Sequence, residues 1–283
     1  MKFGINLLAV MKFFPLKLFS KLAVLSEELG YNGYFMADHY NLPGPIHECL
    51  EPFTTLAYIA AKTKKINLGT MVTPIPRYFP PQLAKIVAHV DHLSEGRIIF
   101  GIGAGWHPPE FKTYCQDQTF YDSSQLVNRT IEGMKLIFKL WTEKSVEFEG
   151  KYYSLKRANL EPKPFQKPYP PIWSGGKGDF MLKMAAKHFD GWIYVNWEQK
   201  NSEDYQKKVE KVKKHLQVFG RDINKFTFAI QASIADPLER VKTFVDAGCN
   251  YYVPVLGYPK QLKADQCLPA AKNFAHEVMA SFK

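Results

Sequence analysis

The sequence lacks the features that mark secreted, membrane-spanning and metal-binding proteins. Its 283 residues include only four cysteines, and no two are spaced as Cys-x-x-Cys, which is typical of reduced thiols in a cytoplasmic protein. No apolar run approaches the roughly 18 residues of a membrane span. No HExxH motif occurs, and His89 and His92 have no third ligand nearby in the sequence. We therefore expect neither a membrane segment nor a metal site.

Acidic residues are fewer than basic ones. There are 27 acidic residues against 37 lysines and arginines, which gives a formal net charge of +10. A positive surface favours anionic partners. However, no basic stripe interleaved with aromatic residues occurs, so we interpret the excess as a lysine-rich solvated surface and expect no nucleic-acid partner.

Residues 66–111 contain the clearest structural unit. Two apolar runs of strand length, 66–74 and 97–105, flank one segment of helical period, 81–96. The apolar residues predicted for one face of that helix are Leu83, Ile86, Val87, Val90 and Leu93. A β-α-β unit of this kind forms a parallel sheet with its crossover helix packed outside.

The same alternation of strand and helix continues along most of the chain. The predicted strands are 2–9, 33–38, 66–74, 97–105, 170–176, 191–197, 225–234 and 250–256. The predicted helices are 16–29, 52–63, 81–96, 124–141, 178–189, 203–218, 239–248 and 269–281. We expect 106–122 to be a loop and 146–155 to be a short β-hairpin inserted before strand five. These repeats predict an α/β fold, a (β/α)8 TIM barrel that forms one domain over 1–283.

Chemistry in such barrels takes place where the strands end. The segments predicted at the strand ends are Ala9, Asp38-His39, 70–73, 103–106, 174–178, Asn196-Trp197, 231–233 and 255–257. No strand is predicted to end in lysine, which argues against a Schiff-base aldolase. The side chains that carry the function should therefore be sought in these segments.

The turn 174–178, with the sequence SGGKG, is the best candidate for holding an anion. Free backbone N–H groups and the dipole of the following helix favour a phosphate there. A tight turn that needs positive φ is the alternative interpretation. The other glycine-rich run, 101–105, lacks the third glycine of a dinucleotide fingerprint, and we expect Pro108-Pro109 to prevent the helix that should follow. A Rossmann fold is therefore not predicted.

His39 is a histidine at a strand end beside a carboxylate, Asp38. A histidine there can hydrogen-bond a bound ring or relay a proton, or it can be a satisfied structural residue. Trp106, His107 and Glu110 follow strand four closely enough to line a pocket, and loop packing is the alternative for them.

Several stretches of the sequence resemble the bacterial luciferase-like superfamily, whose (β/α)8 barrels use FMN or the deazaflavin F420. They are ADH at 37–39, LGTMVTP at 68–74, LAK at 83–85, LSEGRIIFGIGAGWHPPEF at 93–111, FEGKYY at 148–153 and SGGKGDFMLKMAAKHFDGW at 174–192. The resemblance implies that the cofactor phosphate binds to Ser174, Gly175, Gly176, Lys177 and Gly178. It implies a ring supported by a bulge, often with a non-proline cis peptide, at Thr70, Met71 and Val72, with Ala104, Gly105 and Trp106 beside it.

From their positions near the strand ends, we expect His39, Asp38 and Glu110 to act in catalysis. Several F420 members carry an acidic residue two positions after the glycine that ends strand four. Here Trp106 follows Gly105, and the first carboxylate is Glu110. This departure leaves the identity of a general acid open.

Together, these features predict a cytoplasmic oxidoreductase that moves a hydride between a small organic substrate and F420. The ADH stretch and the basic surface favour F420, and an FMN-dependent monooxygenase is the alternative. A flavin-binding relative without activity and a phosphosugar isomerase or lyase on the same barrel also remain open. The family resemblance further implies a homodimer.

Overall fold

The computed structural model describes residues 1–8, 10–11, 13–43, 48–115, 117–196, 201–257 and 262–282. Ala9 and Trp197, which the sequence assigns to strand ends, lie outside this set. None of the described helices is long and apolar enough to cross a membrane.

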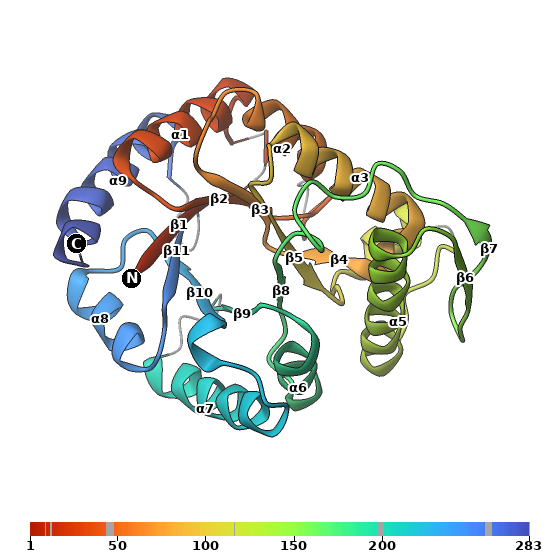
Figure 1. The fold of residues 1–283 in the computed structure, drawn as a ribbon. Helices are drawn as coiled ribbons and strands as arrows, with labels where there is room; N and C mark the ends of the chain where they lie inside the picture. Colours follow the sequence, from red (N-terminus) through yellow and green to blue (C-terminus); the bar gives the residue numbers. More distant parts are fainter. Residues whose placement is uncertain are drawn as a thin grey trace.

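The described strands form a closed parallel barrel surrounded by helices (Figure 1). Around the barrel they are Asn67–Thr70 (β3), Gly33–Met36 (β2), Lys2–Leu7 (β1), Tyr251–Leu256 (β11), Thr227–Ser233 (β10), Gly191–Val195 (β9), Ile172–Ser174 (β8) and Ile98–Gly103 (β5). Pairing of β3 with β5 closes the ring, and the short strand Thr73–Pro74 (β4) continues β3 alongside β5. The predicted TIM barrel is confirmed.

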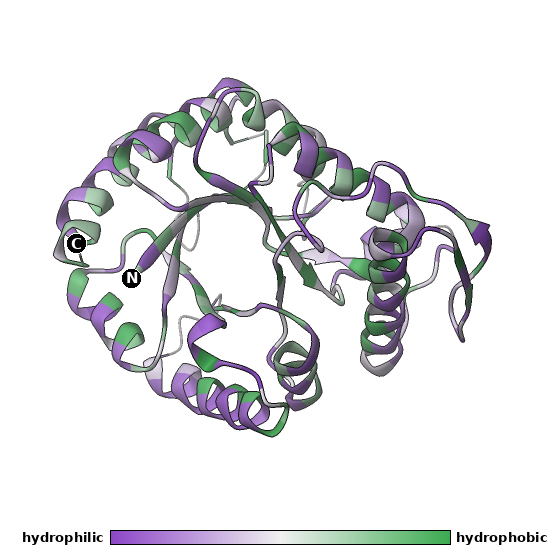
Figure 2. Cartoon of the chain, in the orientation of Figure 1, coloured by the Kyte–Doolittle hydropathy of each residue, from purple (hydrophilic) through white to green (hydrophobic). Residues whose placement is uncertain are grey.

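Helices cover the outside of the barrel. They are Leu16–Leu29 (α1), Pro52–Ala60 (α2), Pro80–Leu93 (α3), Pro108–Tyr114 (α4), Ser123–Thr142 (α5), Asp179–His188 (α6), Ser202–Val218 (α7), Leu238–Asp246 (α8) and Ala264–Glu277 (α9). Three short 3-10 turns follow β4, α7 and α9, at Ile75–Arg77, Ile223–Lys225 and Met279–Phe282. Hydrophilic residues gather on the outer faces of the helices (Figure 2), as expected when the apolar faces cover the strands.

Two helix predictions were wrong, and both helices contain proline. Pro108 and Pro109 do not prevent a helix; they begin α4, because the first turn has no N–H bonds for proline to lose. The last helix begins at Ala264 rather than 269, and it runs through Pro269.

On α3, Ile86 and Leu93 are exposed although the sequence placed them on the buried face.

The predicted hairpin is present as Val146–Glu149 (β6) and Ser154–Ala158 (β7), paired antiparallel at the edge of the molecule beside α5 (Figure 1). Glu132 of α5 holds its turn, because the Glu132 carboxylate accepts hydrogen bonds from the N–H groups of Lys151, Tyr152 and Tyr153 at 3.0, 2.7 and 2.8 Å. The Glu132 carboxylate thus fixes the turn to α5, while Val146 and Leu155 pack against the core.

Aromatic rings fill the barrel interior. The centroids of Phe35, Trp173 and Tyr251 lie 5.6, 6.0 and 4.8 Å apart in pairs. Neighbouring strands make room with glycine: a Cβ atom at Gly4 would lie 2.7 Å from the ring of Phe35. The rings block the interior, so that a ligand can enter only above them, where the strands end.

Candidate functional site

His39 lies just beyond the end of β2. It is held by a carboxylate that lies 71 positions further along the sequence. Its Nδ1 atom is 3.0 Å from Oε2 of Glu110 on α4. The other oxygen of Glu110 accepts hydrogen bonds from the backbone N–H of Tyr40 at 2.6 Å and from Nη1 of Arg77 at 3.1 Å. Glu110 is buried, whereas His39 is partly exposed.

The charge state of Glu110 determines which nitrogen of His39 carries hydrogen. Burial opposes ionisation of Glu110, but the hydrogen bond and charge of His39, together with Arg77, outweigh it and lower the pKa of Glu110. An ionised carboxylate can only accept, so Nδ1 of His39 donates to it. In the neutral ring Nε2 is then the proton acceptor.

Asp38 points into a buried ion pair. Its carboxylate contacts the guanidinium of Arg77, and the hydroxyl of Tyr78 donates to both carboxylate oxygens, at 3.1 and 3.0 Å. Arg77 also stacks over the ring of Tyr40 at 4.1 Å. Arg77 thus joins Asp38 to Glu110, and the Asp38 carboxylate faces this buried ion pair.

Sequence reasoning missed Arg77. The available signal was an isolated arginine in the apolar stretch TPIPRYFP, close to two strand-end carboxylates that each need a counter-charge once buried. Arg77 is separated from Asp38 by 39 positions in the sequence and from Glu110 by 33 positions. Only the closed barrel brings these three residues together.

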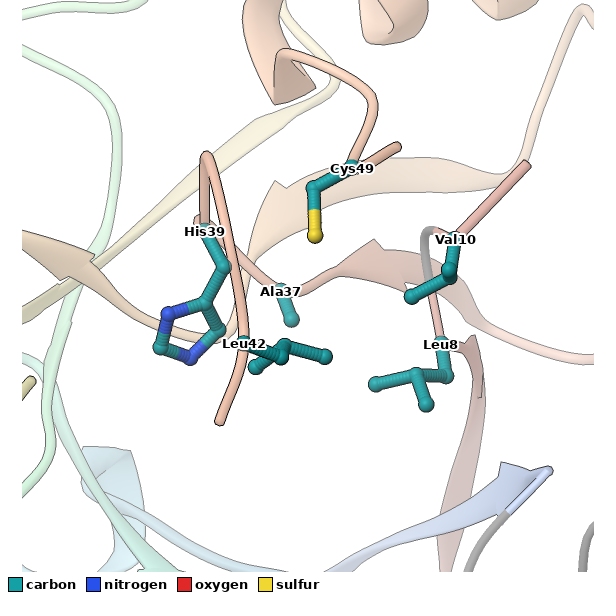
Figure 3. Close-up of a pocket in the computed structure, with 6 residues that line it drawn as sticks. All are labelled: Leu8, Val10, Ala37, His39, Leu42 and Cys49. Carbon is teal, nitrogen blue, oxygen red and sulfur yellow. The ribbon is translucent and has the colours of Figure 1, made fainter. Parts of the chain in front are cut away.

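An apolar pocket adjoins His39 (Figure 3). Leu8, Val10, Ala37, Leu42 and Cys49 line it together with the histidine ring. Burial raises the pKa of the Cys49 thiol to about 11, so this side chain is neutral at physiological pH and forms part of the apolar wall. Among the described lining residues, His39 alone brings a titratable ring to an otherwise uncharged surface.

The bulge between β3 and β4 lies beside this region. The Met71–Val72 peptide is cis, as the resemblance implied. Thr70 Oγ1 donates to the carbonyl of Gly101 at 2.8 Å, and Met71 packs into the barrel interior. A Cβ atom at Gly103 would lie 2.7 Å from Val72, so that glycine is required next to the bulge.

In the loop after β5, some residues pack against α4 and others lie near His39. Ala104 packs against the cluster of Phe111 and Leu126. Gly105 has φ +86, and a Cβ atom there would lie 2.5 Å from the ring of Phe111, so this glycine allows α4 to approach. Trp106 is 58% exposed and meets the His39 ring edge-on, with centroids 5.7 Å apart.

The turn 174–178 has the form of an anion cradle, but one of its N–H groups is not available to an anion. The N–H of Gly175 donates to the carbonyl of Ile102 at 2.7 Å and is not free, contrary to the sequence expectation. The N–H groups of Gly176 and Gly178 have no partner among the described residues. Gly176 has φ +107, Ser174 is fully buried, and no atom lies within 4 Å of a Cβ built at Gly178.

The start of α6 adds to this cradle. Gly178 is its N-cap and offers no side chain to the first-turn N–H groups. Lys177 extends over the ring of Tyr194 at 4.8 Å, and the carboxylate of Asp179 turns to Lys211 at 2.7 Å. Free donors at a helix N-terminus suit a phosphate.

The structure thus combines a closed parallel barrel, a cis bulge between β3 and β4 and a glycine-rich turn between β8 and α6, the arrangement that the family resemblance implied. Residues 1–243 match the family model described as luciferase-like monooxygenase, and the chain belongs to this family. It is 34% identical over 187 residues to an F420-dependent glucose-6-phosphate dehydrogenase of Kineococcus radiotolerans, covering 64% of this chain and 53% of that protein.

Two further proteins extend the comparison. A 5,10-methylenetetrahydromethanopterin reductase of Archaeoglobus fulgidus is 28% identical over 242 residues, covering 86% of this chain and 66% of that protein. The crystal structure of the monooxygenase RslO1 from Streptomyces bottropensis superposes with a TM-score of 0.85 over all of both chains at 19% identity, which establishes the shared fold. The matches to the dehydrogenase and the reductase span about half and two thirds of those proteins.

Proposed function

We propose that this protein transfers a hydride between an alcohol or its carbonyl product and F420. The observation that carries the proposal is His39, fixed by an ionised Glu110 at the mouth of a barrel whose similar proteins include F420-dependent enzymes. The structural fit of the cofactor rests on the cradle at 174–178, where Gly178 leaves open space and two backbone N–H groups have no partner in the described part of the chain. The bulge at Thr70, Met71 and Val72 would support the ring.

The residues of the chain perform the proton half of the reaction. A bound deazaflavin would supply the hydride acceptor. Nε2 of His39 would take the proton of the substrate hydroxyl when the carbon that bears this hydroxyl gives up hydride and becomes a carbonyl carbon. Glu110 holds the ring in the required tautomer and stabilises the positive charge that develops on it. The apolar wall of Leu8, Leu42 and Cys49 excludes water from the reacting groups.

Separate titrations of the cofactor-free protein with F420 and FMN, followed by fluorescence, test the choice of cofactor. We expect micromolar binding of F420 and at least tenfold weaker binding of FMN, a difference of about 1.4 kcal/mol. Tight FMN binding with no detectable F420 binding would move the function to an FMN-dependent monooxygenase. Failure of both to bind would refute the proposal.

The phosphate turn is tested by Gly176→Val. Because Gly176 has φ +107 and faces Met181, valine strains the turn and moves its N–H groups. We expect the affinity for FMN or F420 to fall at least tenfold, about 1.4 kcal/mol. Riboflavin, which has no phosphate, should bind the variant and the parent equally.

Lys177→Ala is the matched control for that turn. A flexible ammonium contributes only a screened point charge, so we expect a smaller loss than for Gly176→Val. Equal losses for riboflavin and FMN in Gly176→Val would mean that the turn shapes the whole site and does not bind the phosphate.

A further inference from the structure

Two buried amide side chains inside the barrel have hydrogen-bonding atoms without partners. Asn6 on β1 and Gln231 on β10 are 1% and 2% exposed. Nδ2 of Asn6 and both Nε2 and Oε1 of Gln231 bond to nothing in the part of the chain that the structure describes. An unsatisfied buried polar atom costs about 1–3 kcal/mol, so three of them require an explanation.

Both side chains face the interior. Side chains alternate along a strand, and the neighbours of Asn6, Ile5 and Leu7, belong to the core between strands and helices. The same holds for Gln231, whose neighbours Ile230 and Ala232 lie in that core. The two amides therefore belong to the inner lining of the barrel.

The strand register places the two amides at one height. In an eight-stranded barrel of shear 8, two residues at the same height along the barrel axis differ by one residue from the paired register at each step to the next strand. Asn6 pairs with Val255 of β11, and one residue back is Pro254. Pro254 pairs with Ala232 of β10, and one residue back is Gln231. Asn6 and Gln231 thus share one layer of inward-facing side chains.

The same count in the other direction reaches the bulge. Asn6 pairs with Phe35 of β2, and one residue forward is Met36. Met36 pairs with Thr70 of β3, and one residue forward is Met71. The amides therefore lie level with the cis bulge that would support a cofactor ring, and above the aromatic rings that block the interior.

We propose that Asn6 and Gln231 bind the imide edge of the cofactor ring. This edge, shared by flavins and deazaflavins, presents a carbonyl, an N–H and a second carbonyl, which is two acceptors around one donor. The unpartnered atoms are two donors, Asn6 Nδ2 and Gln231 Nε2, and one acceptor, Gln231 Oε1. The two sets are complementary, and the inference rests on the proposed cofactor-dependent function.

The test compares riboflavin with 3-methylriboflavin, in which a methyl group replaces the imide hydrogen. Neither probe carries a phosphate, so the turn at 174–178 does not contribute. We expect the parent protein to bind riboflavin at least tenfold more tightly than the methylated probe. In Asn6→Leu and Gln231→Met, riboflavin affinity should fall to near that of the methylated probe, and the preference should drop to about twofold or less.

Thermal unfolding of the cofactor-free protein provides the second readout. Because each substitution removes a polar group that has no partner, we expect the melting temperature of Asn6→Leu and Gln231→Met to equal or exceed that of the parent. Asn250→Leu is the control. Both ends of its amide are bonded, with Oδ1 accepting from Phe228 N–H at 2.8 Å and Nδ2 donating to the Phe226 carbonyl at 2.9 Å. This control should lose stability and keep the preference for riboflavin.

Each other outcome contradicts the proposal in a distinct way. Lower melting temperatures with an unchanged preference would show that the amides hold buried water for the fold. An unchanged preference in stable variants would place imide recognition elsewhere. A parent protein that binds neither probe nor FMN nor F420 would refute the proposed function itself.

Discussion

His39→Ala should lower kcat/KM at least a hundredfold, which corresponds to about 2.7 kcal/mol of transition-state stabilisation. The substitution removes the nitrogen that accepts the substrate proton, and nothing else described at this wall of the pocket can replace it. The partly exposed ring contributes little to the fold, so the melting temperature should stay close to that of the parent.

The assay uses the alcohol that the parent oxidises fastest with F420. His92→Ala is the control, because His92 is an exposed histidine on α3 that contacts the carbonyl of Lys163 far from the pocket in the fold. This control should retain parental kinetics. A His39→Ala variant with near-normal kcat/KM and a much lower melting temperature would show that the histidine is structural.

Arg77→Met should be the most destabilising change in the site. It leaves the carboxylates of Asp38 and Glu110 buried without their shared counter-charge, and breaking a buried pair in this way costs about 3–5 kcal/mol. For a chain of this size, a loss of that magnitude lowers the melting temperature by roughly 10 °C. Differential scanning calorimetry measures it directly.

A double variant sharpens this prediction. Asp38→Asn in the Arg77→Met background removes one uncompensated charge, so part of the lost stability should return. Arg157→Met, at an exposed arginine of the hairpin, should unfold like the parent. An Arg77→Met protein within a degree or two of the parent would mean that the ion pair contributes no net stability.

The barrel could be predicted because its evidence is local and repeated. Strand and helix periods alternate along the chain, and strand ends of a parallel barrel meet at one face whatever the details of packing. The end of α1 at Gly30, a left-handed cap, follows from the sequence in the same way. The exposed Ile86 and Leu93 show the limit, because helical period identifies a face but not how much of it the barrel covers.

The network behind His39 could not be predicted because it depends on distant pairs. Glu110 could be identified as a nearby carboxylate, but its contact with His39 needs α4, which the sequence interpretation treated as loop. Asp38 was grouped with the catalytic residues for its position beside His39, whereas its orientation toward Arg77 is set by the chain beyond β4. Asn6 had no signal, since one polar residue in an apolar strand indicates a role only when its side chain is known to be buried and unbonded.

Hydride transfer from an alcohol to a deazaflavin can be followed directly through the absorbance of F420. The protein is mixed with F420 and a panel of alcohols that includes glucose 6-phosphate, in sealed cells with and without oxygen, and the absorbance of oxidised F420 is followed. We expect F420 to be reduced at the same rate in both cells, in proportion to the carbonyl product, with no oxygen consumed. Turnover that requires oxygen, or that proceeds with reduced FMN but not with F420, would contradict the proposed function.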